Sequence, residues 1–407
     1  MNKVFLDYNS TTPVSKEVLE AMLPYFSEKF GNPSSLHSFG QEALHAVDKA
    51  RLQVAKLLGA KVDEIIFTGS GTESNNLAIS GIARLNMYKP VHPLKLPPSI
   101  SPNSENDSSR SKDMLVYKNH IITSSVEHSS VYDLCKQLEE EGFDVTYLPV
   151  DKHGRISIKD LEDSITDKTV LISVTLANNE TGTIQNIKEI SRIATEKYIP
   201  THTDAVQAVG KMPVSVEELG VDLLSFSGHK IYGPKGVGAL FVARGLNLLP
   251  LLYGGGQENR KRSGTENVPG IVGLGKACEI AENNLDKNIE NMRSMRDRLE
   301  RGILSNISFA KVNGVSAERV PNTTNISFPG MESDTLLIRL DFEGIAISAG
   351  SACGAASKSA SRTLTAMGLS SKELYSSVRF SVGKYTTNEE IDHVIKAVTK
   401  VCLKRKR

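Results

Sequence analysis

The chain alternates between stretches with a helical spacing of apolar residues and short runs rich in β-branched residues. In residues 39–58, apolar side chains recur every three to four positions, which predicts an amphipathic helix. Similar spacing predicts helices at residues 15–26, 77–85, 132–141 and 275–283. The strand-like runs lie at residues 64–67, 120–123, 145–148, 170–174, 198–203 and 221–226. Strands separated by helices predict βαβ units, and therefore an α/β fold with a mostly parallel sheet.

Two segments interrupt this alternation. Apolar residues from Leu285 to Ile303 form one long helical stripe, which predicts a connection into a second domain that runs to the C-terminus. Residues 89–113 are rich in Pro, Ser, Asn and Lys and show almost no periodicity. They predict a solvated, mobile loop, and a loop of this length is unusual inside a compact domain.

Composition narrows the class of protein. The 407 residues include 48 Lys and Arg against 47 Asp and Glu, so the net charge of +1 argues against a nucleic-acid partner bound through a broad basic face. An apolar content of 39% is enough for a large core. No apolar run approaches the roughly 18 residues that a membrane helix needs, and acidic Asp7 follows the first apolar residues at once. We therefore expect a cytoplasmic protein without a membrane partner.

The four cysteines are scattered, with no CxxC pair and no Cys/His cluster at metal-binding spacing. The pattern therefore predicts neither a disulfide framework nor a metal site. Cys353 differs from the others because small residues surround it at 348–357, where nothing large anchors the chain. An exposed thiol is readily oxidised, so a nucleophile on a mobile loop is favoured over a chance cysteine.

Candidate chemistry follows three of the predicted strands. Gly71 and Thr72 open a helix after the strand at 64–67, Asp204 follows the strand at 198–203, and Lys230 follows the strand at 221–226. Taken singly, these residues could be a helix cap, a second cap and a solvated lysine. Together they match the needs of pyridoxal 5'-phosphate (PLP): a lysine that forms an imine, an acid for the ring nitrogen, and a helix N-terminus for the phosphate.

Further side chains could complete such a site. His128 offers a flat ring for stacking, and Asn179 and Gln207 offer amides for the cofactor's ring oxygen. Arg379 lies among strand-like residues, where a substrate carboxylate would satisfy its guanidinium. A structural polar contact or salt bridge is the ordinary alternative for each of these residues.

With these residues assembled, the chain resembles the NifS/IscS-type cysteine desulfurases, which are PLP enzymes of the fold-type-I aminotransferase superfamily. The resemblance covers nearly the whole chain, from Val4 to about Val401. Its motifs lie at residues 6–13, 30–35, 71–75, 177–182, 225–230 and 262–267.

The resemblance implies a fold-type-I layout, with a mostly parallel seven-stranded type of sheet in a large domain plus a smaller α+β domain. The large PLP-binding domain would span residues 15–262, and residues 1–14 and 263–407 would form the small domain with the mobile Cys loop. The resemblance also implies an obligate homodimer and a sulfur-acceptor protein, such as an iron–sulfur scaffold or another carrier.

By the same resemblance, Cys353 would carry a persulfide, Arg379 would bind the carboxylate of L-cysteine, and Thr265 would reach the phosphate from a second subunit. The remaining cofactor contacts would come from eight large-domain positions besides Lys230: Gly71, Thr72, His128, Asn179, Asp204, Gln207, Ser227 and His229. The implied reaction converts L-cysteine to L-alanine and leaves sulfane sulfur on the enzyme.

Three departures from the family pattern leave alternatives open. Residues 89–113 are longer than usual, residues 354–360 differ from the usual continuation after the cysteine, and the chain ends soon after its last predicted helix. A selenocysteine lyase is the nearest enzymatic alternative. A catalytically idle scaffold-binding subunit is the alternative from a different class, although the presence of Lys230, Asp204 and Cys353 together disfavours it.

Overall fold

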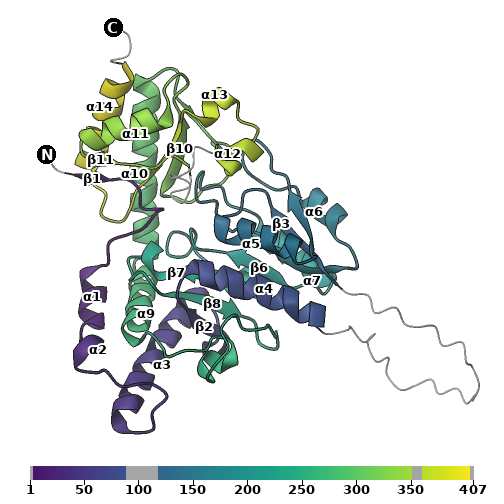
Figure 1. Ribbon diagram of the computed structural model, residues 1–407. Helices are drawn as coiled ribbons and strands as arrows, with labels where there is room; N and C mark the ends of the chain where they lie inside the picture. The colour runs from purple at the N-terminus through teal and green to yellow at the C-terminus, as the bar shows by residue number, and fades with distance from the viewer. Residues whose placement is uncertain (1–2, 89–117, 351–359, 404–407) are drawn as a thin grey trace, which may run out of the picture.

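A computed structural model describes residues 3–88, 118–350 and 360–403, and places them in a large α/β domain and a smaller α+β domain (Figure 1). The large domain is built on a seven-stranded sheet with the order β2-β8-β7-β6-β5-β3-β4. Only β8 runs antiparallel to its neighbours. The strands are β2 (Ile65–Thr68), β3 (His120–Ser124), β4 (Asp144–Leu148), β5 (Thr169–Ser173), β6 (Thr201–Asp204), β7 (Leu223–Ser227) and β8 (Gly238–Val242).

Helices cover both faces of this sheet. One face carries α4 (Gly71–Tyr88) and α5 (Ser129–Glu140). The other carries α1 (Lys16–Met22), α3 (Ser38–Leu58), α6 (Ile158–Ser164), α7 (Ile187–Glu196), α8 (Val216–Leu219) and α9 (Val268–Asn283). Shorter helical segments are α2 (Pro24–Ser27) and the 3₁₀ turns η1 (Val62–Glu64), η2 (Gly228–Lys230) and η3 (Gln257–Arg260).

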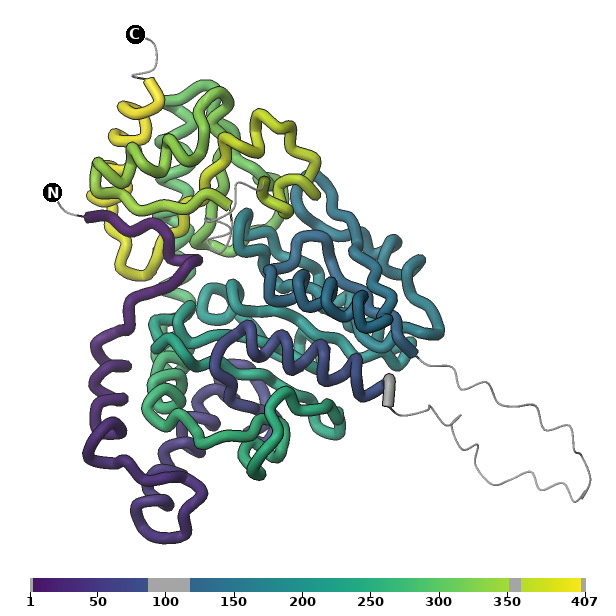
Figure 2. The backbone as a smooth tube through the Cα atoms, viewed as in Figure 1, coloured from purple at the N-terminus to yellow at the C-terminus, as the bar shows by residue number. Residues whose placement is uncertain are grey.

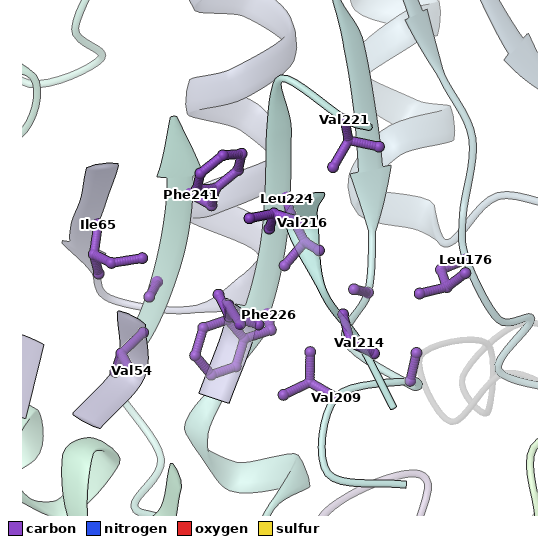
Figure 3. Close-up of a cluster of buried hydrophobic side chains, with 14 of the residues drawn as sticks. Val54, Ile65, Leu176, Val209, Val214, Val216, Val221, Leu224, Phe226 and Phe241 are labelled. Atoms are coloured by element: carbon purple, nitrogen blue, oxygen red, sulfur yellow. The ribbon is translucent and has the colours of Figure 1, made fainter. Parts of the chain in front are cut away.

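Alternation along the buried strands explains the layers. In β7, Leu223 packs into the core under α4 and α5, while Leu224 and Phe226 pack into the core on the opposite face (Figure 3). Adjacent side chains of a strand point to opposite faces, so a central strand of a sheet covered on both sides is buried at every position, mostly by apolar residues as in β7 but by polar ones in β6. The continuous β-branched runs in the sequence are the signature of this burial.

The small domain has its own hydrophobic core, formed by residues of its helices and short strands. Figure 2 shows the yellow C-terminal part of the chain in this domain, next to the purple start of the chain. Strands β12, β10 and β9 form an antiparallel sheet in that order, and β1 pairs in parallel with β11. The strands are β1 (Val4–Phe5), β9 (Lys311–Val312), β10 (Thr323–Ser327), β11 (Ile345–Ala346) and β12 (Ser377–Ser381). The helices are α10 (Leu285–Asn306), α11 (Ser333–Phe342), α12 (Arg362–Ala366), α13 (Ser371–Leu374) and α14 (Asn388–Leu403).

The N-terminal segment joins the two domains. Val4 pairs with Ile345 in the small domain, and a few residues later the Thr12 N–H donates to the His229 carbonyl in the large domain. Buried residues of α9 belong to the large domain's core, whereas those of α10 belong to the small domain's core. This packing favours a domain division between these two helices. The division at residue 262 stays a prediction.

The predicted α/β class and fold-type-I layout are confirmed, and two local differences have physical causes. The strand predicted at 198–203 begins only at Thr201, because Tyr198 has a φ of 55° and cannot extend the strand. The helix predicted at 15–26 is divided in two, with Pro24 starting the second part.

Candidate functional site

A cavity of about 220 Å³ lies beyond the carboxyl ends of β6 and β7. This is the edge where ligands bind in open α/β sheets. The cavity brings together ten of the twelve predicted site residues, which are Gly71, Thr72, His128, Asn179, Asp204, Gln207, Ser227, His229, Lys230 and Arg379. Thr265 is exposed and does not line the cavity. Cys353 lies outside the described residues.

The N-terminus of α4 forms one wall of the cavity. Helix α4 begins at Gly71, so its first N–H groups and its positive dipole end face a ligand that binds there. A Cβ added to Gly71 would lie 2.7 Å from Val206 Cγ2, which explains why this wall needs a glycine. Ser70 Oγ accepts from the Glu73 N–H at 3.1 Å and so caps the helix without filling the cavity.

The carboxylate of Asp204 is held at the end of β6. Its Oδ1 accepts from the Val206 N–H at 2.9 Å, and its Oδ2 accepts from Asn75 Nδ2 at 2.8 Å. Asp204 is 5% exposed, and both oxygens keep capacity for another donor. A protonated ring nitrogen is the kind of group that a buried, oriented carboxylate of this type would bind.

Lys230 ends the 3₁₀ turn that follows β7, and its amine is directed toward the N-terminal segment. Nζ donates to the carbonyls of Asn9 and Ser10, the latter at 2.6 Å. The neighbouring His229 is partly desolvated and close to cationic Lys230, which together lower its pKa to about 4. At neutral pH His229 is therefore an uncharged ring, whose Nδ1 lies 3.1 Å from Thr11 Oγ1.

His128 is fixed by its place at the start of α5. As the N-cap residue it accepts the Ser130 N–H at Nδ1, at 3.1 Å, and the same nitrogen lies 2.9 Å from Ser130 Oγ. The ring is therefore held in one orientation beside the cavity. This cap was the alternative explanation for a polar residue at this position, and the geometry accommodates a stacking role as well.

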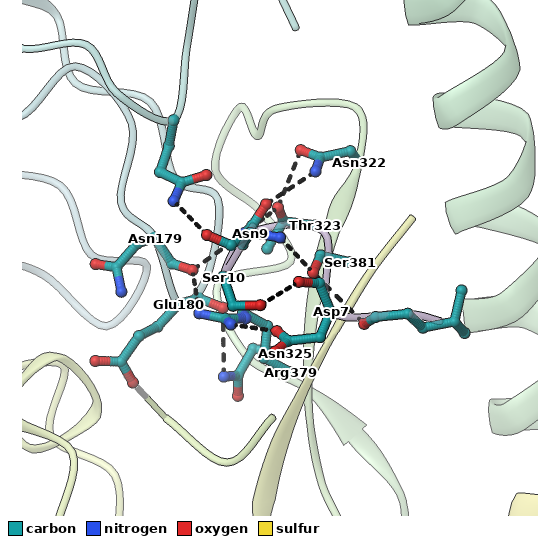
Figure 4. Close-up of polar contacts among 12 residues, drawn as sticks. Asp7, Asn9, Ser10, Asn179, Glu180, Asn322, Thr323, Asn325, Arg379 and Ser381 are labelled. Atoms are coloured by element: carbon teal, nitrogen blue, oxygen red, sulfur yellow. Dashed lines mark hydrogen bonds and ion pairs between the residues drawn. The ribbon is translucent and has the colours of Figure 1, made fainter. Parts of the chain in front are cut away.

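Arg379 projects from β12 of the small domain and is 1% exposed (Figure 4). Its Nη2 donates to Asp7 Oδ1 at 2.6 Å, and its Nη1 donates to the Asn179 carbonyl at 3.0 Å. Its buried Nε has no hydrogen-bond partner among the residues that the structure describes. The salt bridge predicted as the ordinary alternative is thus present. A carboxylate bound in the cavity would add a partner to a guanidinium that is incompletely satisfied.

Asn9 is a site residue that the sequence analysis missed. Its carbonyl accepts from both Lys230 and Gln207, and its Nδ2 donates to the Asn179 carbonyl at 3.1 Å and to Thr323 Oγ1 at 2.8 Å (Figure 4). The motif at residues 6–13 contains Asn9, but these contacts span up to 314 positions of the sequence. Local patterning carries no signal for contacts of this kind.

Comparison with known proteins then decides the family. The family model for class-V aminotransferases matches residues 4–90 and 108–394. The chain belongs to the class-V aminotransferase family. The prediction of this superfamily from sequence motifs is confirmed.

Relatives of this class-V chain are named as cysteine desulfurases. It is 47% identical to cysteine desulfurase IscS of Dictyoglomus turgidum over an alignment of 399 residues. This alignment covers 98% of this chain and 94% of the Dictyoglomus protein. It is 46% identical over 401 residues to cysteine desulfurase IscS of Methanosarcina thermophila, and that alignment covers 98% of this chain and 92% of the relative. Among solved structures, a NifS-like protein superposes with a TM-score of 0.86 at 37% identity, covering 98% and 99%.

The described cysteines of this class-V protein are poor nucleophiles. Cys135, Cys278 and Cys402 are free and buried, and burial raises the pKa of Cys135 and of Cys402 to about 12. None of the three lines the cavity. Buried thiols of this kind are inert, which leaves Cys353 as the candidate nucleophile.

Proposed function

We propose that this class-V family member is a PLP-dependent cysteine desulfurase, which converts L-cysteine to L-alanine and keeps the sulfur as a persulfide on Cys353. One observation carries the proposal: a lysine, a buried carboxylate, a helix N-terminus and an arginine converge on one cavity. The relatives named as cysteine desulfurases support it over nearly the whole chain.

The residues around the cavity fit PLP. The start of α4 at Gly71 offers N–H groups to a phosphate, and a side chain there would collide with Val206. Asp204 presents an oriented carboxylate for the ring nitrogen, and Lys230 presents an amine on the same cavity. Thr72, Ser227 and His229 add donors for the phosphate, while His128 would lie on the ring face.

When bound, PLP supplies an electron-withdrawing ring that stabilises negative charge on the substrate carbon next to the amine. The chain's own residues do the rest. Lys230 would hold the cofactor in the resting enzyme and, once the substrate amine has displaced its own amine, would accept the proton that leaves the substrate carbon. Arg379 binds the substrate carboxylate, and Asp204 keeps the ring nitrogen protonated. Asn179 and Gln207 contact the ring oxygen.

Cys353 completes the reaction as the nucleophile. Its thiolate attacks the substrate sulfur, so a sulfur–sulfur bond forms while the carbon–sulfur bond breaks. The bonding pair stays on the three-carbon fragment, which takes up protons and leaves as alanine. The sulfane sulfur on Cys353 then passes to an acceptor protein, an iron–sulfur scaffold or another sulfur carrier.

The proposed active unit is a homodimer. Thr265 is exposed in the single chain, and in this proposal it contacts the phosphate in the partner subunit. Among the residues that the structure describes, no helix is long and apolar enough to cross a membrane. A cytoplasmic location stays a prediction.

Turnover of L-cysteine by the purified protein tests the function. We expect alanine and sulfane sulfur in equal amounts, and loss of both in Lys230→Ala together with loss of the covalently attached cofactor. Lys235→Ala is the matched control, because Lys235 is an exposed lysine of the same loop. If borohydride reduction and peptide mapping placed the cofactor on Lys235, the assignment of Lys230 would be wrong.

A further inference from the structure

Lys211 is a buried lysine whose amine has no role in the reaction described above. It is 5% exposed, and its Nζ donates to Gln207 Oε1 at 2.6 Å and to Asn9 Oδ1 at 3.2 Å. Neither partner is a carboxylate. Burial, together with the cationic Lys230 and Arg379 nearby, lowers its pKa well below the usual value of 10.5. Natural proteins rarely bury a lysine this way without a specific use.

The contact with Lys211 determines which way the Gln207 amide faces. Gln207 Oε1 accepts from Lys211, while Nε2 donates to the Asn9 carbonyl at 3.0 Å. If the amide were reversed, its oxygen would face the Asn9 carbonyl and its NH₂ group would face the amine of Lys211. The contact with Asn9 would then lose its hydrogen bond, and the contact with Lys211 would keep one only where that amine is uncharged. Only one orientation satisfies both neighbours.

This orientation has a consequence for the cavity that Gln207 lines. The amide nitrogen carries two N–H groups, of which one is used by Asn9. The other is left for a ligand, so Gln207 offers the cavity a donor rather than an acceptor. The Asn9 backbone that carries this carbonyl is held in turn, because the Asn9 N–H donates to Ser381 Oγ at 2.9 Å.

We propose that Lys211 is a positioning residue that locks the Gln207 amide so that it donates a hydrogen bond to the ring oxygen of bound PLP. The inference rests on the proposed function, because the ring oxygen belongs to that cofactor. A donor at this oxygen favours its anionic form. Lys211 thereby lowers the pH at which the bound cofactor loses the proton that it shares with this oxygen.

A spectroscopic pH titration of the PLP-loaded protein tests the proposal. In Lys211→Met the amide loses one of the two contacts that fix its orientation, and we expect the midpoint of the visible absorption change to rise by about one pH unit. Methionine has a similar length, and a cavity of about 20 Å³ beside Lys211 gives it room. Lys188→Met, at an exposed lysine on α7, is the matched control and should leave the midpoint unchanged.

A double variant separates positioning from simple loss of a nearby amine. Gln207→Met should raise the midpoint as Lys211→Met does, and combining the two should add nothing further, because Lys211 acts only through Gln207. An additional rise in the double variant would overturn the proposal, since it would show a direct electrostatic effect on Lys230. If Lys211→Met did not fold, an unchanged midpoint in Gln207→Met would overturn it equally.

The outcomes also separate this inference from the proposed function. A wild-type protein that binds PLP and turns over cysteine, but whose midpoint is unaffected by Lys211→Met, would refute only the role of Lys211. A wild-type protein that shows no visible cofactor band after incubation with PLP would refute the proposed function, and the role of Lys211 with it.

Discussion

Arg379 shows how a charged side chain is tolerated in the interior of this protein. Its guanidinium lies between Asp7 of the N-terminal segment and the carbonyl of Asn179 in the large domain, although Arg379 itself belongs to the small domain (Figure 4). Removing one partner of a buried pair leaves an uncompensated charge, which costs more than the pair contributes. Asp7 therefore compensates the buried charge of the arginine that we propose as the substrate-binding residue.

We predict that Asp7→Asn lowers the free energy of unfolding by about 1–3 kcal/mol, because asparagine keeps an acceptor but loses the charge. Urea denaturation measures this change. Asp63→Asn is the control, because Asp63 pairs with Arg244 at the surface, where an ion pair contributes little. If both substitutions lowered the free energy of unfolding equally, the buried pair with Arg379 would stabilise the protein no more than a surface ion pair does.

Glu127 is a second buried charged residue near the cavity. Its Oε1 accepts from Ser124 Oγ and from the Thr175 N–H at 2.9 Å, while its buried Oε2 has no hydrogen-bond partner within the described part of the chain. Burial, reinforced by nearby Asp204, raises the pKa of Glu127 from 4.5 to about 7. The folded protein therefore keeps a proton between these two values that the unfolded chain releases.

Glu127 should make the protein less stable as the pH rises. The extra proton on Glu127 stabilises the folded state fully below about pH 4.5, and this stabilisation is lost as the pH rises to about 7. Over this range the free energy of unfolding therefore falls by about 3 kcal/mol. We predict that the free energy of unfolding falls by this amount more in the wild type than in Glu127→Gln between about pH 5 and about pH 8. Parallel pH profiles would contradict the raised pKa.

Among single residues, sequence reasoning found those with distinctive chemistry and missed those that act through partners. Lys230 and Asp204 follow predicted strands, so the sheet rule placed them at one edge. Asn9, Glu127 and Lys211 carry no such signal. Their roles depend on contacts and burial that only the folded chain creates.

At the scale of elements, α4 combines a cavity wall with a core helix. Its first residue, Gly71, faces the cavity, and its apolar residues pack against the sheet through Ile79 and Ile82. Near its middle, a Cβ on Gly81 would lie 2.8 Å from the Leu249 carbonyl. The helix therefore has two glycines with similar steric limits but different surroundings.

These two glycines permit a matched comparison. We predict that Gly71→Ala weakens PLP binding at least about tenfold, because the new methyl group displaces the helix start from Val206. Gly81→Ala should lower stability through its own clash but leave the cofactor dissociation constant nearly unchanged. Fluorescence titration of the apoprotein with PLP measures both. Equal loss of affinity would show that general destabilisation, not the helix start, is responsible.

The strands also show what patterning can and cannot predict. Six of the seven strands of the large sheet correspond to predicted runs. Full burial gives β2 and β7 mostly apolar sequences, whereas β4 is only partly buried and β6 is polar. The seventh, β8, follows the Lys230 turn closely and runs antiparallel between β2 and β7. The alternation of strands and helices did not predict β8, because no α-helix separates it from β7. Its sequence, Gly238–Val242, is nevertheless a short, almost entirely apolar run.

Residues 89–113, predicted to form a solvated loop, lie outside the described residues. The family model aligns residues 4–90 and 108–394 and passes over residues 91–107 between them. We predict that replacing residues 91–107 with a short Gly/Ser linker preserves PLP binding and changes the melting temperature by only a few degrees. Loss of soluble, cofactor-binding protein would show instead that this insertion packs against the core.

At the scale of the whole molecule, residues of both domains line the cavity. Arg379 lies on β12 of the small domain, Lys230 lies in the turn after β7 of the large domain, and Asn9 lies on the segment that connects the two domains. The described residues on either side of residues 351–359 contact Arg379, which lines the cavity, and Glu180, which follows the cavity residue Asn179. Ser348 pairs with Arg379 through the backbone, and Ser361 Oγ donates to Glu180 Oε2 at 2.6 Å.

Cys353 itself lies outside the described residues, so its role is tested by chemistry. We predict that Cys353→Ser still binds PLP and L-cysteine, because Lys230, Asp204 and Arg379 are unchanged, but yields less than about one hundredth of the wild-type alanine. Binding is measured by the spectral change on adding cysteine, and turnover by alanine and persulfide. The loss should be confined to turnover.

The same variant separates the desulfurase from a selenocysteine lyase. Selenium leaves carbon more easily than sulfur and can depart without capture by a thiol, so a dedicated lyase depends less on Cys353. A serine variant that turned over cysteine near the wild-type rate would contradict the thiolate attack proposed here. A wild-type protein that ignored cysteine but released selenium from selenocysteine would establish the lyase. Retained selenocysteine cleavage in Cys353→Ser, beside lost cysteine cleavage, would instead show one site in which only sulfur removal requires the thiol.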